Sequence, residues 1–206
     1  LRQDVTIVFQ NGKAIIFLNK WKQDGQTITP AKTFHLQPTA LLELISFHHA
    51  EIHRDNDISS IHSMSKDQRF LLPNTSFTIP QTKKEIEVSN QIKKKVKAYL
   101  DRSWQDLIHH FSINQKQYIA IPLIKINKLP AYLNNHFSPL TIKQITGQLI
   151  EGLYKNYILQ AMDLDVSDPM PLLLLAKDRS HMLIVYSLND EPSLLRQELP
   201  KQDSKD

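Results

Sequence analysis

Residues 5–21 read VTIVFQNGKAIIFLNKW, two β-rich runs joined by the dipeptide Asn11-Gly12. Asn and Gly tolerate the positive φ angles of a type I′ turn, whose twist matches that of two antiparallel strands. The sequence therefore predicts that a β-hairpin opens the chain. A further run, QTITPAKTFHL at residues 26–36, extends this prediction to a β-meander, in which Pro30 favours an edge strand or a bulge.

The segment from Pro38 to about His53 is predicted to form the first helix, since proline suits a first helical turn. Its apolar residues recur at helical spacing; they are Leu41, Leu42, Ile45 and Ile52. Residues 54–68 are polar and show no capping pattern, so we expect a loop there. Short strands are expected in the RFLLP and SFTIP runs that follow.

A long amphipathic helix is predicted to begin at the capping box TKKE, residues 82–85. In this motif the threonine oxygen accepts from a backbone N–H group that has no helical partner, and the glutamate reaches back to the start of the helix. Apolar residues from Val88 to Phe111 then fall on one side at about 100° per residue, which extends the helix to about His110.

The rest of the chain predicts a strand, a second helix and a hairpin. Residues 118–126 are expected to be a strand interrupted by Pro122, and Ser138-Pro139 leads an amphipathic helix. Residues 171–188 are typical of a β-hairpin. The expected fold class is α+β: an N-terminal β-meander with one helix, then a long amphipathic helix, a strand, a second helix and a C-terminal β-hairpin.

Charge is distributed unevenly along the chain, although the net charge is only +4. Residues 91–160 carry ten Lys and Arg against three Asp and Glu, whereas residues 161–206 carry five against nine. The middle of the chain is therefore the part that would attract anions. The expected organisation is a meander lobe over 1–81, a helix-strand-helix-hairpin lobe over 82–189, and an acidic, mostly disordered tail over 190–206.

Composition excludes several classes of protein. With 41% apolar and 22% charged residues, the chain is typical of a soluble globular protein, and no apolar run approaches the ~18 residues of a membrane span. The absence of cysteine excludes disulfides, thiolate metal sites and cysteine nucleophiles. Four glycines and no glycine-rich run argue against a phosphate-binding loop. The start at Leu1, without an apolar signal core, leads us to expect a cytoplasmic protein that is mature, truncated or begun at an unusual codon.

Residues 47–57, FHHAEIHRDND, raise the possibility of a metal site. On the predicted helix His49 and His53 are four residues apart, a spacing at which two imidazoles can share an ion. Glu51 would lie on the opposite side of that helix and could not act as a general base for the pair. We expect a helix end with no metal or cofactor, and keep a metal-dependent hydrolase using His49 and His53 as an alternative. Its third ligand would be one of Asp55, Asp57 or His62.

The basic middle of the chain suggests binding to an anionic partner. Tyrosines and Trp104 alternate with its basic residues, and such a mixture is typical of nucleic-acid binding. We expect a non-catalytic binding or regulatory module that engages nucleic acid, or another polyanion, through residues 91–160. The alternatives are a solvated helix face and a protein-interaction domain that uses the helix at 88–110. The candidate contact residues are Lys93, Lys94, Lys95, Lys97, Arg102, Lys116, Lys125 and Lys128.

Overall fold

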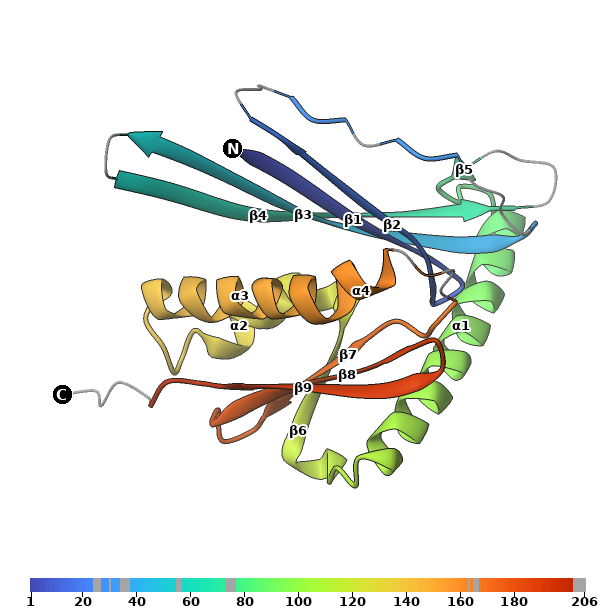
Figure 1. Ribbon diagram of the computed structural model, residues 1–206. Helices are drawn as coiled ribbons and strands as arrows, with labels where there is room; N and C mark the ends of the chain where they lie inside the picture. Colours follow the sequence, from blue (N-terminus) through green and yellow to red (C-terminus); the bar gives the residue numbers. More distant parts are fainter. Residues whose placement is uncertain are drawn as a thin grey trace. The chain divides into compact units, whose positions relative to one another are not determined.

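The computed structural model describes residues 1–23, 27–29, 31–33, 38–54, 57–72, 77–162, 164 and 167–201. The chain forms two compact units, Leu1–Ala98 and Tyr99–Asp206, and the boundary between them lies inside helix α1 (Lys83–His110). Each unit contains one antiparallel β-sheet, as Figure 1 shows, and the α+β class is confirmed. The expected division into lobes at residues 81/82 and 189/190 stays a prediction.

The first unit holds a curled five-stranded sheet in the order β2-β1-β3-β4-β5. β1 therefore lies between β2 and β3, so the sheet is not a meander in its first three strands. All neighbouring strands are antiparallel. The strands are β1 (Arg2–Gln10), β2 (Lys13–Lys22), β3 (Ala40–Arg54), β4 (Asp57–Leu71) and β5 (Phe77–Thr78).

The hairpin between β1 and β2 is confirmed. Asn11 and Gly12 have φ angles of 52° and 82°, the positive values that a type I′ turn requires. The Asn11 side chain also accepts a hydrogen bond from the backbone N–H of Leu41 at 2.9 Å. The turn is thereby fastened to the first residues of β3.

The helix predicted from Pro38 to His53 is wrong, because Ala40–Arg54 is strand β3. This strand pairs with β1 on one side and with β4 on the other, so hydrogen bonds from two neighbours outweigh local helical propensity. The alternation typical of a strand is hidden at its start, since Leu41 and Leu42 point to opposite faces and both are buried.

The loop predicted over residues 54–68 is also wrong, because β4 runs from Asp57 to Leu71. The expected short strand near residue 77 is confirmed as β5. Residues 27–29 and 31–33 belong to no strand, and the rest of the proposed third strand at 26–36 lies outside the described residues.

The helix beginnings predicted from capping residues are confirmed. The backbone N–H of Glu85 donates to Thr82 Oγ1 at 3.2 Å, and that of Thr82 donates to Glu85 Oε2 at 3.0 Å. Ser138 caps the second long helix, α3 (Pro139–Leu153), by accepting from the backbone N–H of Thr141 at 3.1 Å. Among the described residues, no helix has both the length and the apolar character that crossing a membrane demands.

The second unit is built on a four-stranded sheet in the order β6-β7-β8-β9. The expected hairpin is confirmed as β7 and β8, which pair antiparallel. Pro122 ends β6 and is followed by a 3₁₀ segment, so the predicted strand is shorter than expected. The strands are β6 (Tyr118–Pro122), β7 (Leu172–Ala176), β8 (His181–Leu188) and β9 (Glu191–Glu198). The remaining elements are η1 (Gln115–Gln117), η2 (Leu123–Lys128), α2 (Leu129–Leu133), the π-helical turn η3 (Tyr154–Ile158) and α4 (Leu159–Ala161).

Helices cover both faces of this second sheet. Leu107 and Ile108 of α1 pack against one face in a buried cluster with leucines of β7 and β8. On the other face, the side chain of Gln197 donates to the backbone carbonyl of Ile145 in α3 at 3.1 Å. Figure 1 shows α3 running along this sheet. The β7 residues are buried without exception, which explains the unbroken LLLLA run.

Strand β9 corrects the expectation that residues 190–206 are mostly disordered, since residues 191–198 pair with β8. The two-residue connection uses Asn189 and Asp190 at φ angles of 52° and 63°, which these residue types adopt more readily than most others. The buried carboxylate of Asp168 accepts from both of their backbone N–H groups, at 2.9 and 3.1 Å. This contact from a distant part of the sequence supports the turn.

Candidate functional site

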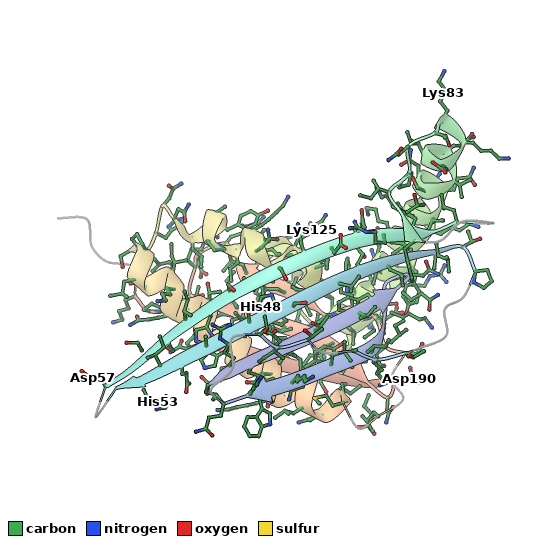
Figure 2. All side chains as sticks on the ribbon, turned by 90° about the horizontal axis from the view of Figure 1, so that it is seen from above. His48, His53, Asp57, Lys83, Lys125 and Asp190 are labelled. Atoms are coloured by element: carbon green, nitrogen blue, oxygen red, sulfur yellow. The ribbon has the colours of Figure 1, made fainter. Side chains whose placement is uncertain are left out.

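Strand geometry rearranges the histidines of residues 47–57. Successive side chains on a strand point to opposite faces, so His49, Glu51 and His53 share one face of β3 and His48 lies on the other. Glu51 therefore lies between the two histidines, and its expected place opposite them is wrong. Figure 2 shows His53 close to the β3–β4 turn and far from Lys83.

The face with Glu51 carries a row of hydrogen bonds. The Glu51 carboxylate accepts from Nε2 of His49 at 2.8 Å and from Nε2 of His53 at 3.0 Å. These hydrogen bonds lower the pKa of Glu51. Nδ1 of His49 lies 3.1 Å from Nδ1 of His62 on β4. A neutral His49 that donates through Nε2 must accept at Nδ1, so His62 is the donor in this pair.

The geometry of this row does not favour the metal-site alternative. Among the described residues, no group of three or more His, Asp or Glu side chains could hold a metal ion. The ring nitrogens of His49 and His62 bond to each other instead of facing a common point. Asp55, one of the suggested third ligands, lies outside the described residues.

The opposite face of the same strands carries a second chain of hydrogen bonds. Nδ1 of His48 lies 2.9 Å from Oδ1 of Asp4 on β1, and Nε2 of His48 lies 2.8 Å from Oγ of Ser65 on β4. Because an ionised Asp4 can only accept, a neutral His48 donates through Nδ1 and accepts the Ser65 proton at Nε2. The side chains of His48 and Asp4 are 38% and 23% exposed, so these hydrogen-bonded residues are accessible to solvent.

A pocket of about 300 Å³ lies next to this chain of hydrogen bonds. Asp4 and His48 belong to its wall, together with apolar side chains of β4 and of the segment after β2. Its volume is at the lower end of the range for small-molecule sites, about 300–1,000 Å³. The lining residues are Arg2, Asp4, Thr27, Ile28, His48, His49, Ala50, Ile61 and Ser63.

The eight basic candidates are all exposed, but they belong to different parts of the chain. Lys93, Lys94, Lys95 and Lys97 are on the α1 segment of the first unit. The second unit carries the others on α1, η1 and η2: Arg102, Lys116, Lys125 and Lys128. Binding of an anion by these eight side chains stays a prediction.

The first half of α1 carries three lysines on its outer side, beside the exposed Glu87. At about 100° per residue, Lys83, Lys94 and Lys97 fall within an arc of about 60°, on the side opposite the buried Ile92 and Val96. We call these three residues the α1 basic face. Lys83 lies at the free end of the helix in Figure 2.

Most aromatic residues of the basic segment are engaged inside the second unit. Trp104 Nε1 donates to the backbone carbonyl of Met170 at 2.7 Å, and Tyr157 is fully buried. The Tyr118 hydroxyl lies 2.9 Å from Nε2 of His181. Tyr132 is exposed. The aromatic side chains therefore give little support to base stacking.

Sequence reasoning missed the chain Asp4–His48–Ser65 because it placed His48 on a helix and Ser65 in a loop. The signal that was available is the alternation of His49, Glu51 and His53 at two-residue spacing, which is the period of a strand. No local signal connects Asp4 to His48, since the register of β1 on β3 brings them together.

Comparison of the chain with protein-family models, with curated proteins and with solved structures gives no match.

Proposed function

We propose that the chain is a binding module that engages the phosphate backbone of a nucleic acid through the α1 basic face. The observation that carries the proposal is the gathering of Lys83, Lys94 and Lys97 on the outer side of one helix. The helix itself supplies a rigid support, because its other side is buried at Ile92 and Val96.

The spacing of these lysines suits a polyanion better than a small anion. Lys83 and Lys97 are separated by about 21 Å along the helix axis, at 1.5 Å per residue. A single small anion cannot contact both, whereas a nucleic-acid strand presents a phosphate about every 3.4 Å along its axis. The engaged aromatic residues of the second unit favour backbone contacts over base stacking.

The test is the salt dependence of binding to fluorescently labelled single-stranded RNA and duplex DNA. Each lysine that contacts a phosphate releases counterions, so log K should fall with log salt by about 0.7–0.9 per contact. Lys94→Gln with Lys97→Gln should weaken binding to all sequences equally and make this slope shallower. Circular dichroism should show an unchanged helix content.

A matched control removes the same charge elsewhere. Lys143 and Lys177 are exposed residues of the second unit outside the candidate set. Lys143→Gln with Lys177→Gln should leave the salt slope unchanged. Absence of saturable binding at about 0.15 M salt would refute the proposal. Equal losses in the two double variants would show that only net charge matters and that the α1 basic face is not the site.

A further inference from the structure

We infer that Ser65 is an activated nucleophile that accepts an acyl group from small esters, with His48 as its general base and Asp4 as the group that orients His48. This inference is independent of the proposed nucleic-acid binding, since its three residues lie on β1, β3 and β4 and none belongs to the α1 basic face. Its basis is the chain of two hydrogen bonds, at 2.9 and 2.8 Å, that joins the three side chains from three neighbouring strands.

The direction of these hydrogen bonds is the one that nucleophilic catalysis needs. A serine hydroxyl is a weak nucleophile until an adjacent base removes its proton. Asp4 holds a hydrogen on Nδ1 of His48, which leaves the lone pair of Nε2 directed at the Ser65 hydroxyl. Ser65 is exposed, so an ester can reach its oxygen.

Strand pairing fixes the three groups in place. His48 lies opposite Asp4 on one neighbouring strand and opposite Ser63 on the other. Ser65 is two residues beyond Ser63 on the same face, within diagonal reach of His48. Residues on regular strands are held more accurately than residues on loops, which is what a nucleophile and its base require.

The pocket beside His48 indicates which kind of ester could react with Ser65. Asp4 and His48 form part of its wall, and Ile28, Ala50 and Ile61 supply apolar surface. A volume of about 300 Å³ admits a small molecule but not a polymer. Ser65 is not among the lining residues, but His48 belongs to the wall and bonds to Ser65, so a small ester with an apolar group in the pocket would reach Ser65 across His48.

The reaction balances with the groups present. Ser65 Oγ forms a bond to the ester carbonyl carbon while its proton passes to Nε2 of His48. The bond to the alcohol oxygen then breaks, and His48 returns the proton to the leaving alcohol, which leaves an acyl-Ser65. In the second half, a water oxygen forms a bond to the acyl carbon while one of its protons passes to Nε2 of His48. The bond to Ser65 Oγ then breaks, and His48 returns the proton to that oxygen, which releases the acid and restores the Ser65 hydroxyl.

The donor for the developing oxyanion comes from a hydroxyl next to Ser65. Leu1 and Glu51 exchange two backbone hydrogen bonds. Because bonded pairs alternate along an antiparallel ladder, the odd-numbered residues of β3 bond to β1 and the even-numbered ones bond to β4. Ser46 therefore bonds through its backbone to its partner Ser65. The Ser65 amide is therefore engaged. Ser46 lies opposite Ser65, and its hydroxyl is 2.8 Å from that of Thr6. When Thr6 donates to Ser46, the Ser46 hydroxyl keeps its own hydrogen for the oxyanion.

A single side-chain donor limits the reaction to activated esters. Removing one donor from an oxyanion site costs about 10²–10³ in rate, so alkyl esters should react slowly. The probe is therefore 4-nitrophenyl acetate, with release of nitrophenolate measuring acylation and peptide mass spectrometry locating the acetyl group. We expect acetylation of Ser65, and none at that position in Ser65→Ala.

Two further variants test the roles. His48→Gln should lower the rate of Ser65 acetylation about 100-fold or more, as loss of a general base does. Asp4 is a positioning residue, and Asp4→Asn should transfer the imidazole hydrogen of His48 from Nδ1 to Nε2. The ¹⁵N chemical shifts of the ring report this change of tautomer, which a purely structural role would not produce.

The controls keep the outcome decisive. Ser59 is exposed on the same face of β4, and His53 is on the opposite face of β3, so Ser59→Ala and His53→Gln should acetylate Ser65 at the wild-type rate. Circular dichroism establishes that each variant is folded. Acetylation confined to lysines, or a Ser65 rate unchanged in folded His48→Gln, would overturn the inference.

Discussion

The two sheets of this molecule differ in how much of their surface is exposed to solvent. The second sheet has helices on both faces, and its central strands β7 and β8 are almost entirely buried. In the first sheet, the part of β4 from residue 59 to 63 is exposed at every position. A covered sheet needs apolar residues on both faces to form its core, whereas the open end of the first sheet is free to carry polar chemistry. Both histidine clusters lie there.

Amide hydrogen exchange should show the largest difference between the sheets. Amides of β7 and β8 should exchange only on global unfolding, which for a domain lies at about 5–15 kcal/mol. In β4 the amides of Ser60 and Met64 point away from β3, and among the described residues β5 pairs only with the far end of this strand. These amides should exchange about 10³-fold faster or more. Equal protection of these amides and those of β7 and β8 would show that the end of β4 is as stable as the covered sheet.

Truncation of a leucine in the second sheet should lower the free energy of unfolding more than truncation of an isoleucine in the first. Leu174→Ala in β7 removes a side chain that is 0% exposed and should cost about 3 kcal/mol, because it leaves a cavity. Ile61→Ala in β4 removes one that is 63% exposed and should change the stability by about 0.5 kcal/mol or less. Urea unfolding measures both. A similar loss in the two variants would show that the end of β4 is part of a core.

The hairpin turn of the first sheet gives a smaller effect. Gly12→Val should destabilise the protein by about 1–3 kcal/mol, since a β-branched residue resists the φ of 82° found there. Gly147 in α3 is the matched control, because a Cβ added there meets no atom within 4 Å. Gly147→Ala should stabilise by about 0.5–1 kcal/mol. An unchanged melting temperature for Gly12→Val would contradict the turn assignment.

Glu51 should give the smallest effect, and one that depends on pH. Its hydrogen bonds from His49 and His53 lower its pKa, so its contribution is fully present above the usual value of 4.5 and is lost as the pH falls through the lowered one. Glu51→Gln should cost roughly 0.5 kcal/mol or less at pH 7. The difference in melting temperature should shrink toward pH 3. A difference that stays constant would remove the electrostatic explanation.

Local sequence signals predicted much of the fold correctly. Asn11-Gly12, the Thr82 capping box and the Ser138 cap act mainly through neighbouring atoms, so they can be recognised without knowledge of distant residues. β3 could not be predicted in this way. Its hydrogen bonds come from β1 and β4, and its first residues are buried on both faces, so helical spacing and strand alternation could not be distinguished.

The candidate sites were less predictable than the fold. The exposed lysines of α1 follow from helical periodicity, because a helix is a local structure. The contact of His48 with Asp4 and Ser65 depends on the register of three strands that are 17 to 44 residues apart in sequence. Because β3 was predicted to be a helix and most of β4 a loop, neither histidine cluster could be predicted.

Helix α1 has a thermodynamic consequence for the whole chain. Residues 83–98 belong to the first unit and residues 99–110 to the second, yet the helix is continuous. Isolated helices shorter than about 12–15 residues are marginal in water, so the 12-residue second half is marginal without the turns that precede it, and the 16-residue first half is only slightly longer than that limit. Melting either unit frays the helical end on which the other depends. The two units should therefore unfold in one cooperative transition, and a truncation at residue 98 should yield two unstable fragments.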